Sequence, residues 1–324
     1  MVKLGIIGCG GWGKNWVREA QNQKVLMAVC DPRLQDLRLN LPSEVNQFNE
    51  LDTFLFEADV EAVVIATPAE THKDVALKCI AANKHVFIEK PLAVSYEDSK
   101  MIVDAIEQKS LVGMVGHLML YHPAIAWIKN YINQGELGDL YYVTARRLNL
   151  GVVRQKENAI WSLAPHDLSI ALHLFDEAPS RVRAMGDCFL QKSLDVADVG
   201  FIHMNFPSGK MFHGHFSWLD PVKKREIVLV GSKKMIVFED SSLQEKVRVY
   251  DKGAITLEEG HPVISCNTPQ IFNGDIYIPS ISNEPSLTRE LKAFCHAVKG
   301  DVTANLSPLS QGCEVAAILE KSIV

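Results

Sequence analysis

The sequence predicts an α/β fold in two parts: an amino-terminal domain built on a parallel sheet and a carboxy-terminal α+β domain built on a large, mainly antiparallel, open-faced sheet. Over the first 116 residues, short apolar runs alternate with stretches of helical periodicity, which is the rhythm of strand–helix–strand units. From residue 181 to about residue 257, strand-like runs follow one another without helices between them. A length of 324 residues also suits two domains, which we place at residues 1–120 and 121–324.

The amino-terminal domain contains five predicted strands, at residues 3–7, 25–30, 62–67, 85–89 and 111–115. The third of these is continuously apolar, as expected for a parallel strand that is covered on both faces. A helix is predicted over residues 71–84, between the third and fourth strands. Another helix precedes the fifth strand, where Ser95 and Asp98 form a candidate capping box.

The carboxy-terminal domain begins with a predicted helix over residues 123–134, followed by a strand over 140–150. A second helix is expected to begin near Pro165, because proline is favoured in the first helical turn. Further strands are predicted at residues 199–206, 211–219, 225–231, 234–240 and 246–251. Residues 260–285 are loop-rich, and helices near 286–298 and 309–322 close the chain.

The composition excludes several classes of protein. A net charge of −6 without long Lys/Arg clusters does not suit a nucleic-acid-binding protein, and the apolar runs are too short to span a membrane. The seven cysteines include no C-x-x-C pair, which favours reduced thiols in the cytoplasm over disulfides. His203, His213 and His215 lie on neighbouring predicted strands, but no Cys or carboxylate completes a tetrahedral set, so we expect no metal.

The stretch "LGIIGCGGWGKNW" carries the clearest motif. Gly8, Gly10 and Gly13 fit G-x-G-x-x-G between a predicted strand and a helix, and Asp31 ends the next strand 23 residues after Gly8. This pattern is typical of a dinucleotide fold, in which the helix N-terminus holds the pyrophosphate. Asp31 would accept hydrogen bonds from the ribose hydroxyls and favour NAD, whereas Arg33 leaves NADP open. The residues predicted to bind the cofactor here are Gly8, Gly10, Gly11, Trp12, Gly13, Asp31 and Arg33.

Two further segments end predicted parallel strands at the edge where open α/β sheets bind ligands. "VFIEKPLA" places Glu89 and Lys90 there, and "IATPAETH" places Thr67, Pro68 and His72 there. A lone lysine at a strand end is more often solvated than functional. The three segments together nevertheless predict that Thr67, Pro68, His72, Glu89 and Lys90 contact the cofactor.

The glycine turn, A-T-P…H and E-K-P, in this order and spacing, resemble the glucose-fructose oxidoreductase / inositol dehydrogenase / rhizopine catabolism (Gfo/Idh/MocA) family over nearly the full length. The resemblance implies a Rossmann NAD-binding domain, and a lysine and a histidine that flank the reacting carbinol. These match Lys90 and His166, the latter in "IWSLAPHDLSIALHLF". Many members carry an aspartate four residues before the histidine, where this chain has Ser162. Asp167 follows His166, but adjacent helical side chains point about 100° apart.

The resemblance leaves two assignments of acid–base roles open. His166 has a suitable intrinsic pKa to take the hydroxyl proton, while Lys90 orients the hydroxyl and stabilises the oxyanion as a cation. Alternatively, a lysine desolvated by the nicotinamide is itself the base. We favour the first assignment.

The stretch "ARRLNLGVVRQKEN" indicates an anionic substrate group, because arginine binds phosphate bidentately; a solvated basic edge is the plain alternative. "RLNLG" followed by "WSLAPHD" resembles a branch of the family that oxidises nucleotide sugars at carbon 3, including UDP-N-acetylglucosamine 3-dehydrogenases. Lys156 belongs to the same basic stretch. The residues predicted to bind the substrate are Lys90, His117, Tyr121, Arg147, Asn149, Arg154, Ser162, His166 and Asp167.

The expected function is NAD-dependent oxidation of a sugar secondary alcohol, at C3 of a nucleotide sugar such as UDP-N-acetylglucosamine. A dehydrogenase of a free sugar, inositol or diol is one alternative, and a non-catalytic NAD(P)-binding sensor is another. The resemblance also implies a homodimer or homotetramer that forms through the carboxy-terminal sheet.

Overall fold

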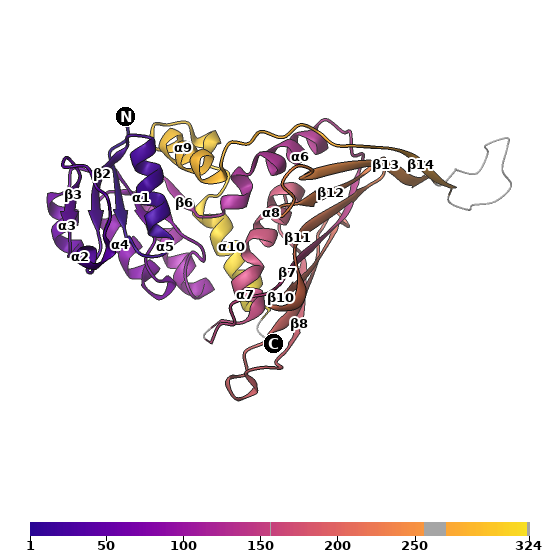
Figure 1. Ribbon diagram of the computed structural model, residues 1–324, viewed down its shortest axis with the longest axis horizontal. Coiled ribbons are helices and arrows are strands. Elements are labelled where there is room, and N and C mark those ends of the chain that lie inside the picture. Colours follow the sequence, from indigo (N-terminus) through magenta and orange to yellow (C-terminus); the bar gives the residue numbers. More distant parts are fainter. Residues whose placement is uncertain (156, 256–269, 323–324) are drawn as a thin grey trace. The chain divides into compact units, whose positions relative to one another are not determined.

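The computed structural model describes residues 1–155, 157–255 and 270–322 (Figure 1). Lys156, Cys266 and part of the predicted loop-rich segment therefore lie outside the described residues. The chain forms two compact units. The first comprises Met1–Tyr121 together with Glu284–Glu320, and the second is built from His122–Asn283.

A parallel sheet of the order β3-β2-β1-β4-β5-β6 forms the centre of the first unit. Its register pairs Ile7 with both Cys30 and Ile65, and Ile65 with Ile88, so the strands end at one edge. The first residues of the loops that follow β1, β2, β4 and β5 therefore share that edge. The strands are β1 (Leu4–Ile7), β2 (Leu26–Cys30), β3 (Asn46–Phe48), β4 (Ala62–Ile65), β5 (His85–Ile88) and β6 (Gly113–Val115).

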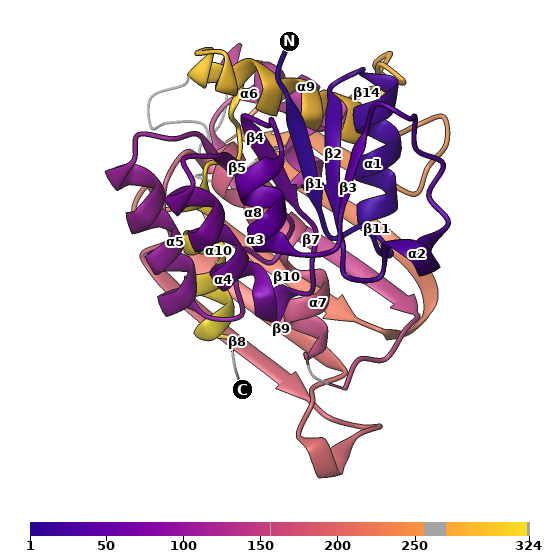
Figure 2. The same ribbon diagram turned by 90° about the vertical axis from the view of Figure 1, so that its left-hand side faces the viewer.

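Helices cover this sheet, and two of them come from the far end of the chain. The side chain of Ser95 accepts a hydrogen bond from the Asp98 backbone N–H at 3.0 Å, as the candidate capping box predicts for its first half. Figure 2 shows α10 beside α5. The helices are α1 (Gly13–Asn22), α2 (Leu34–Leu37), α3 (Leu51–Glu57), α4 (His72–Ala81), α5 (Tyr96–Gln108), α9 (Ser286–Val298) and α10 (Leu309–Glu320), with short 3₁₀ turns η1 (Ala69–Thr71), η2 (Leu118–Tyr121) and η4 (Val302–Ala304).

The packing of α9 and α10 makes the first unit discontinuous in sequence. Leu309 and Cys313 belong to the same buried cluster as Ile102 and Val115, and Pro308 forms an isolated bridge with Met114. The predicted contiguous division at residues 120 and 121 therefore differs from the compact units, because residues 284–320 pack with the amino-terminal sheet. The role of residues 121–324 as a substrate-binding and oligomerisation domain stays a prediction.

The second unit is built on a sheet of the order β14-β13-β12-β11-β7-β10-β9-β8. The sheet is mainly antiparallel, but β7 pairs with β10 in parallel. The fold class expected from the sequence is thus confirmed. The strands are β7 (Leu140–Leu150), β8 (Arg181–Asp187), β9 (Val199–Asn205), β10 (Met211–Ser217), β11 (Leu219–Gly231), β12 (Met235–Glu239), β13 (Val247–Ile255) and β14 (Gln270–Tyr277).

The two faces of this sheet differ in burial. Phe212 and Phe216 are fully buried on one face, where α7 packs on β9 and β10. On the other face, the half-buried ring of Phe201 stacks on His215 with centroids 4.4 Å apart. The helices of this unit are α6 (Pro123–Asn133), α7 (Ala159–Leu163) and α8 (Pro165–Phe175), with the short turn η3 (Lys192–Leu194).

Candidate functional site

The glycine turn after β1 has the geometry that its motif predicts. Gly8 has a φ of +86°, and a Cβ there would lie 2.7 Å from the backbone of Ala66. A Cβ on Gly13 would lie 2.0 Å from the carbonyl oxygen of Gly8. At Gly10 and Gly11, by contrast, a Cβ would meet nothing described within 4 Å. The turn itself therefore requires Gly8 and Gly13, whereas the space over Gly10 is open to a ligand, as a pyrophosphate site requires.

Asp31 joins the end of β2 to this turn. Its Oδ2 accepts a hydrogen bond from the Cys9 N–H at 2.8 Å, and its Oδ1 accepts one from the Arg33 N–H at 2.8 Å. The side chain is only 6% exposed. Each carboxylate oxygen has a second lone pair, so Asp31 can hold the loops together and still accept from a ribose hydroxyl.

The side chain of Glu89, the acid of the E-K-P motif, forms hydrogen bonds that hold the loop after β5. Oε1 of Glu89 accepts a hydrogen bond from the indole N–H of Trp16 at 2.6 Å, and Oε2 accepts one from the Lys90 N–H at 3.1 Å. The indole of Trp12 also donates to this carboxylate. Burial raises the pKa of Glu89, while these hydrogen bonds and the charge of Lys90 act in the opposite direction.

Glu89 is therefore a fixed partner of Lys90, because the attraction between the two side chains favours the ammonium form of the lysine. Trp16 was not among the predicted site residues. Its position on α1, next to the motif, was the available signal, but a tryptophan on an apolar helix face is more often part of the core.

His72 connects the two loops that carry the A-T-P and E-K-P segments. Its Nε2 lies 2.9 Å from the carbonyl oxygen of Thr67, and its Nδ1 lies 2.8 Å from that of Pro91. Burial lowers the pKa of His72 despite these two acceptors. Both ring nitrogens are thus engaged and the side chain is buried, and the direct contact of His72 with the cofactor stays a prediction. Its described role is to position Thr67 and the loop after Lys90.

His117 and Tyr121, which we predicted to bind the substrate, are buried within the first unit. Nδ1 of His117 lies 2.8 Å from Oε1 of Gln311 in α10. Burial lowers the pKa of His117 to about 4, and the nearby Lys90 charge acts in the same direction. The hydroxyl of Tyr121 lies 3.1 Å from Oγ of Ser307 and accepts from the Leu306 N–H. These side chains hold the carboxy-terminal helices against η2, and their contact with a substrate stays a prediction.

In the second unit, His166 lies in the first turn of α8, directly after Pro165. The short helix α7 precedes it and is capped by Asn158, whose side chain accepts from the Trp161 N–H at 2.9 Å. Ser162, in the position where many relatives of the resembled family carry an aspartate, lies in α7 rather than in α8. His166 is half-buried.

Arg147 and Asp167 form a buried ion pair that fixes α8 to β7. Nε of Arg147 donates to Oδ2 of Asp167, and a terminal N–H₂ donates to Oδ1, both at 2.8 Å. The two residues are 9% and 3% exposed. Both carboxylate oxygens of Asp167 therefore accept hydrogen bonds from Arg147, and the contact of Asp167 with a substrate stays a prediction. The edge of Arg147 that would bind a diphosphate bidentately is likewise occupied by a carboxylate of its own chain.

The other predicted substrate residues of the basic stretch lie in different surroundings. Arg154 is exposed, with its Nε 3.5 Å from Oε1 of Glu157. Asn149 is half-buried, and its amide lies against Gly151. Their contact with a substrate stays a prediction.

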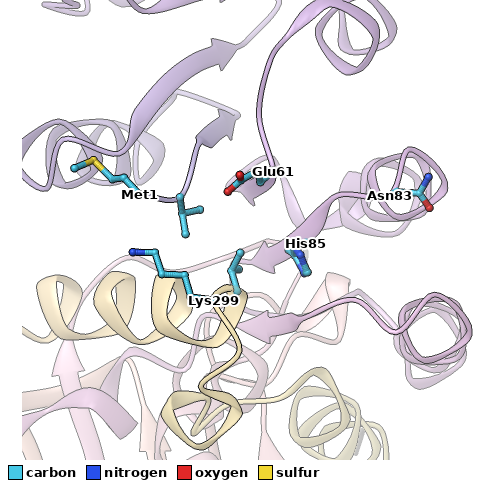
Figure 3. A pocket seen from close by; sticks show the side chains of 7 residues that line it. Met1, Glu61, Asn83, His85 and Lys299 are labelled. Atoms are coloured by element: carbon cyan, nitrogen blue, oxygen red, sulfur yellow. The ribbon is translucent and has the colours of Figure 1, made fainter.

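A pocket of about 500 Å³ lies at the opposite edge of the first unit's sheet (Figure 3). Met1 and Val2 precede β1, Glu61 precedes β4 and His85 begins β5, so the pocket lies where the strands begin. Lys299, after α9, closes its other side. Because dinucleotides bind where such strands end, this pocket is not the cofactor site.

Within the described ranges, no three His, Cys, Asp or Glu side chains are grouped so as to hold a metal ion. A search of the same residues finds no helix with the length and apolarity needed to cross a membrane. The six cysteines that the structure describes are free thiols.

Comparison with known families agrees with this geometry. Residues 2–117 match the model of the oxidoreductase family with an NAD-binding Rossmann fold (GFO_IDH_MocA). Residues 125–237 match the model of the GFO/IDH/MocA C-terminal domain. The two models together span most of the chain, so NAD is the cofactor that the amino-terminal unit binds, as the sequence predicted.

Characterised relatives are spread over several activities. The chain is 25% identical to the 2,7-anhydro-N-acetylneuraminate hydratase of Escherichia coli, over 77% of this chain and 70% of the relative. It is 33% identical to an inositol 2-dehydrogenase of Salmonella typhimurium, over 54% of this chain and about half of the relative's length (55%). It is 26% identical to the UDP-N-acetylglucosamine 3-dehydrogenase of Acidithiobacillus ferrooxidans, over 92% of this chain and 93% of the relative.

Solved structures share the fold over nearly the whole chain. The Acidithiobacillus ferrooxidans UDP-N-acetylglucosamine 3-dehydrogenase has a TM-score of 0.78 at 23% identity, covering 99% of this chain and 98% of that one. The WlbA dehydrogenase of Bordetella pertussis, in complex with NADH and UDP-GlcNAcA, has a TM-score of 0.76 at 19% identity, covering 99% and 94%.

Proposed function

The chain belongs to the Gfo/Idh/MocA oxidoreductase family, and we propose that it oxidises a secondary alcohol of a nucleotide sugar, at C3 of a sugar such as UDP-N-acetylglucosamine. The observation that carries the proposal is the similarity to a UDP-N-acetylglucosamine 3-dehydrogenase over 92% of this chain and 93% of that enzyme. The inositol 2-dehydrogenase of Salmonella typhimurium aligns over about half of either protein, whereas that of Rhizobium meliloti aligns over 97% of this chain at 22% identity. The substrate argument therefore depends on the higher identity, 26%, of the full-length alignment with the UDP-N-acetylglucosamine 3-dehydrogenase.

The residues of the first unit fit the cofactor. The open space over Gly10 suits a pyrophosphate, and Asp31 keeps lone pairs for the ribose hydroxyls. A carboxylate at Asp31 would repel a 2′-phosphate, which favours NAD over NADP. When bound, NAD supplies the hydride acceptor for the carbinol carbon.

In the proposed mechanism, Lys90 and His166 divide the acid–base work on the substrate hydroxyl. The carbinol C–H bond breaks with its electron pair leaving as hydride, and the O–H bond gives its proton to His166. Glu89 stabilises the ammonium of Lys90, which supports the role of a cation that orients the hydroxyl and stabilises its developing negative charge. The adjacent acid argues against the alternative of a neutral lysine as base.

A dehydrogenase of inositol or a free sugar is the second candidate, and one observation favours it. Arg147 is the residue that the sequence favours for binding a diphosphate, but two of its guanidinium nitrogens donate hydrogen bonds to the carboxylate of Asp167 instead. A substrate without a phosphate would need no such arginine.

The test measures the near-ultraviolet absorbance of reduced nicotinamide after mixing the protein and NAD with UDP-N-acetylglucosamine, N-acetylglucosamine or myo-inositol. Turnover of the nucleotide sugar alone, with a 3-keto product by mass spectrometry, supports the proposal, and Lys90→Ala should abolish it while NAD still binds. Turnover of inositol or free sugar in preference would replace the substrate. NAD binding without turnover of any alcohol would favour a sensor. We expect a homodimer or homotetramer acting in the cytoplasm.

A further inference from the structure

A buried acid lies behind the E-K-P loop and has no part in the roles described above. Glu290 belongs to α9 and is 1% exposed. Among the described residues, no hydrogen bond reaches its Oε1. An ionised carboxylate without donors is costly to bury, so a carboxyl group in this place is expected to hold its proton.

A chain of contacts between three aromatic rings connects the surroundings of Glu290 with those of Glu89. Phe294 in α9 contacts Phe87 in β5 with ring centroids 5.7 Å apart, and Phe87 contacts Trp16 at 4.6 Å. Glu290 precedes Phe294 by four residues and so shares its helix face. Glu89 follows Phe87 by two residues and so shares its side of the sheet. The contact between the rings therefore places the two carboxyl groups near each other, and the charge of Glu89 is one cause of the raised pKa of Glu290, after burial.

The two acids have unequal surroundings. Glu89 receives hydrogen bonds from the Trp16 indole and the Lys90 N–H, and it lies beside the charge of Lys90. Glu290 has no such donor at Oε1. Two like charges cannot both be sustained in a buried site, so the better-solvated group keeps the charge and the other keeps the proton.

Other titratable groups near α9 do not change this balance. From η2, Tyr121 lies near Glu290: burial and the charge of Glu290 raise the pKa of Tyr121, while the hydrogen bond with Ser307 lowers it. From α1, Trp16 faces the pair, whereas Lys14 and Arg18 are exposed. Asp301, before η4, is also exposed.

We propose that Glu290 is a positioning residue for Lys90: it carries the single proton of a Glu89–Glu290 acid pair and so keeps Glu89 as the only carboxylate opposite the lysine. The role of Lys90 in turnover rests on the proposed function, but the location of the proton does not. The proton on Glu290 prevents a second buried negative charge behind the cofactor edge, while Glu89 remains free to fix the ammonium.

Infrared spectroscopy of the full-length protein tests where the proton resides. At neutral pH, the wild type should show the C=O band of a protonated, buried carboxyl group. Glu290→Gln should remove this band, and Glu89→Gln, the matched control, should retain it. A band that persists in Glu290→Gln, or is missing from the wild type, would overturn the proposal. Thermal unfolding of each variant confirms that it is folded before its spectrum is compared.

Labelling of Lys90 by an acylating reagent, followed by mass spectrometry, tests the consequence for the lysine. Loss of the Glu89 charge removes a group that favours the charged form of Lys90, so Glu89→Gln should raise the labelling rate at neutral pH by about tenfold or more. Glu290→Gln should leave that rate unchanged, because one neutral group replaces another. An equal acceleration in both variants would mean that Glu290 is ionised. Both measurements work without turnover, so failure of the proposed function would show separately, as activity that survives Lys90→Ala.

Discussion

The ion pair between Arg147 and Asp167 yields the sharpest prediction about stability. Asp167→Asn removes the charge that faces a guanidinium buried to 9% exposure. Two charge-assisted hydrogen bonds at 2.8 Å are weakened or lost, each worth about 1.5–3 kcal/mol. Removal of one partner of a buried pair costs about 3–5 kcal/mol, because the remaining charge stays buried without its counterion. We therefore expect Asp167→Asn to lower the free energy of unfolding by about 3–5 kcal/mol.

A double-mutant cycle measured by urea unfolding separates the pair from the shape of its side chains. Arg147→Met and Asp167→Asn should each be strongly destabilising, whereas the double variant Arg147→Met/Asp167→Asn should lose much less than the sum of the two, since no isolated charge remains. The matched control is the exposed pair Lys100–Asp104, whose loss should change the free energy of unfolding far less, because solvent screens its charges. A loss below about 1 kcal/mol for Asp167→Asn, within the range of surface pairs, would refute the reasoning.

The same pair also bears on the substrate. Asp167 lies next to His166 in the first turn of α8, so Arg147→Met should disturb the position of that histidine and lower kcat. If Arg147 bound a diphosphate instead, the same change would raise KM for a UDP-sugar and leave KM for a free sugar unchanged. Steady-state kinetics with both substrates therefore distinguishes an arginine that positions His166 from one that contacts the substrate.

Three further predictions concern the first unit. Gly10→Ala should leave the melting temperature nearly unchanged but weaken NAD binding by about tenfold or more, about 1.4 kcal/mol per decade, whereas Gly13→Ala should lower the melting temperature. Thermal scans and calorimetric titration measure the two effects. Unimpaired NAD binding by Gly10→Ala would contradict the pyrophosphate assignment. Asp31→Asn should weaken NAD more than NADP in fluorescence titrations, and equal losses would mean that Asp31 only joins the loops. Burial lowers the pKa of His117 from 6.5 to about 4 in the folded protein, so the unfolded chain binds more protons between these pH values. The free energy of unfolding should therefore fall by roughly 3 kcal/mol at most as the pH drops from 6.5 to 4. His117→Gln should flatten this part of the pH–stability curve, and an unchanged slope would refute the prediction.

Much of the fold was predictable because its signals are local. The continuously apolar run that became β4 and the four other strands predicted for the amino-terminal domain lie close to the observed strands. By contrast, β3 (Asn46–Phe48) was missed because it is short, polar and partly exposed. The strand β14 lies in the segment predicted to be loop-rich, since its Asn273 and Gly274 resemble turn residues and most of its side chains are exposed.

The features of the candidate site also divide into those with a local sequence signal and those that depend on distant residues. The turn around Gly8 and Gly13 follows from local steric limits, so a motif predicts it. His117 and Arg147 were recognised as polar residues of suitable chemistry, but their partners could not be identified from the sequence. Gln311 lies 194 residues beyond His117, and no sequence pattern links Arg147 to Asp167. Burial of a polar side chain depends on such distant partners, which is why the sequence could not show that these residues also hold the scaffold.

The return of α9 and α10 to the first unit has a consequence for biosynthesis. Leu309 and Cys313 complete a core whose other members, from Ile7 to Val115, are all translated long before them. A nascent chain leaving the ribosome therefore carries an amino-terminal sheet that is missing part of its cover until synthesis is nearly finished. For this reason, we expect an isolated fragment of residues 1–120 to need chaperones or to aggregate, and a fragment with residues 284–320 grafted on through a short linker to be the smallest autonomous NAD-binding piece.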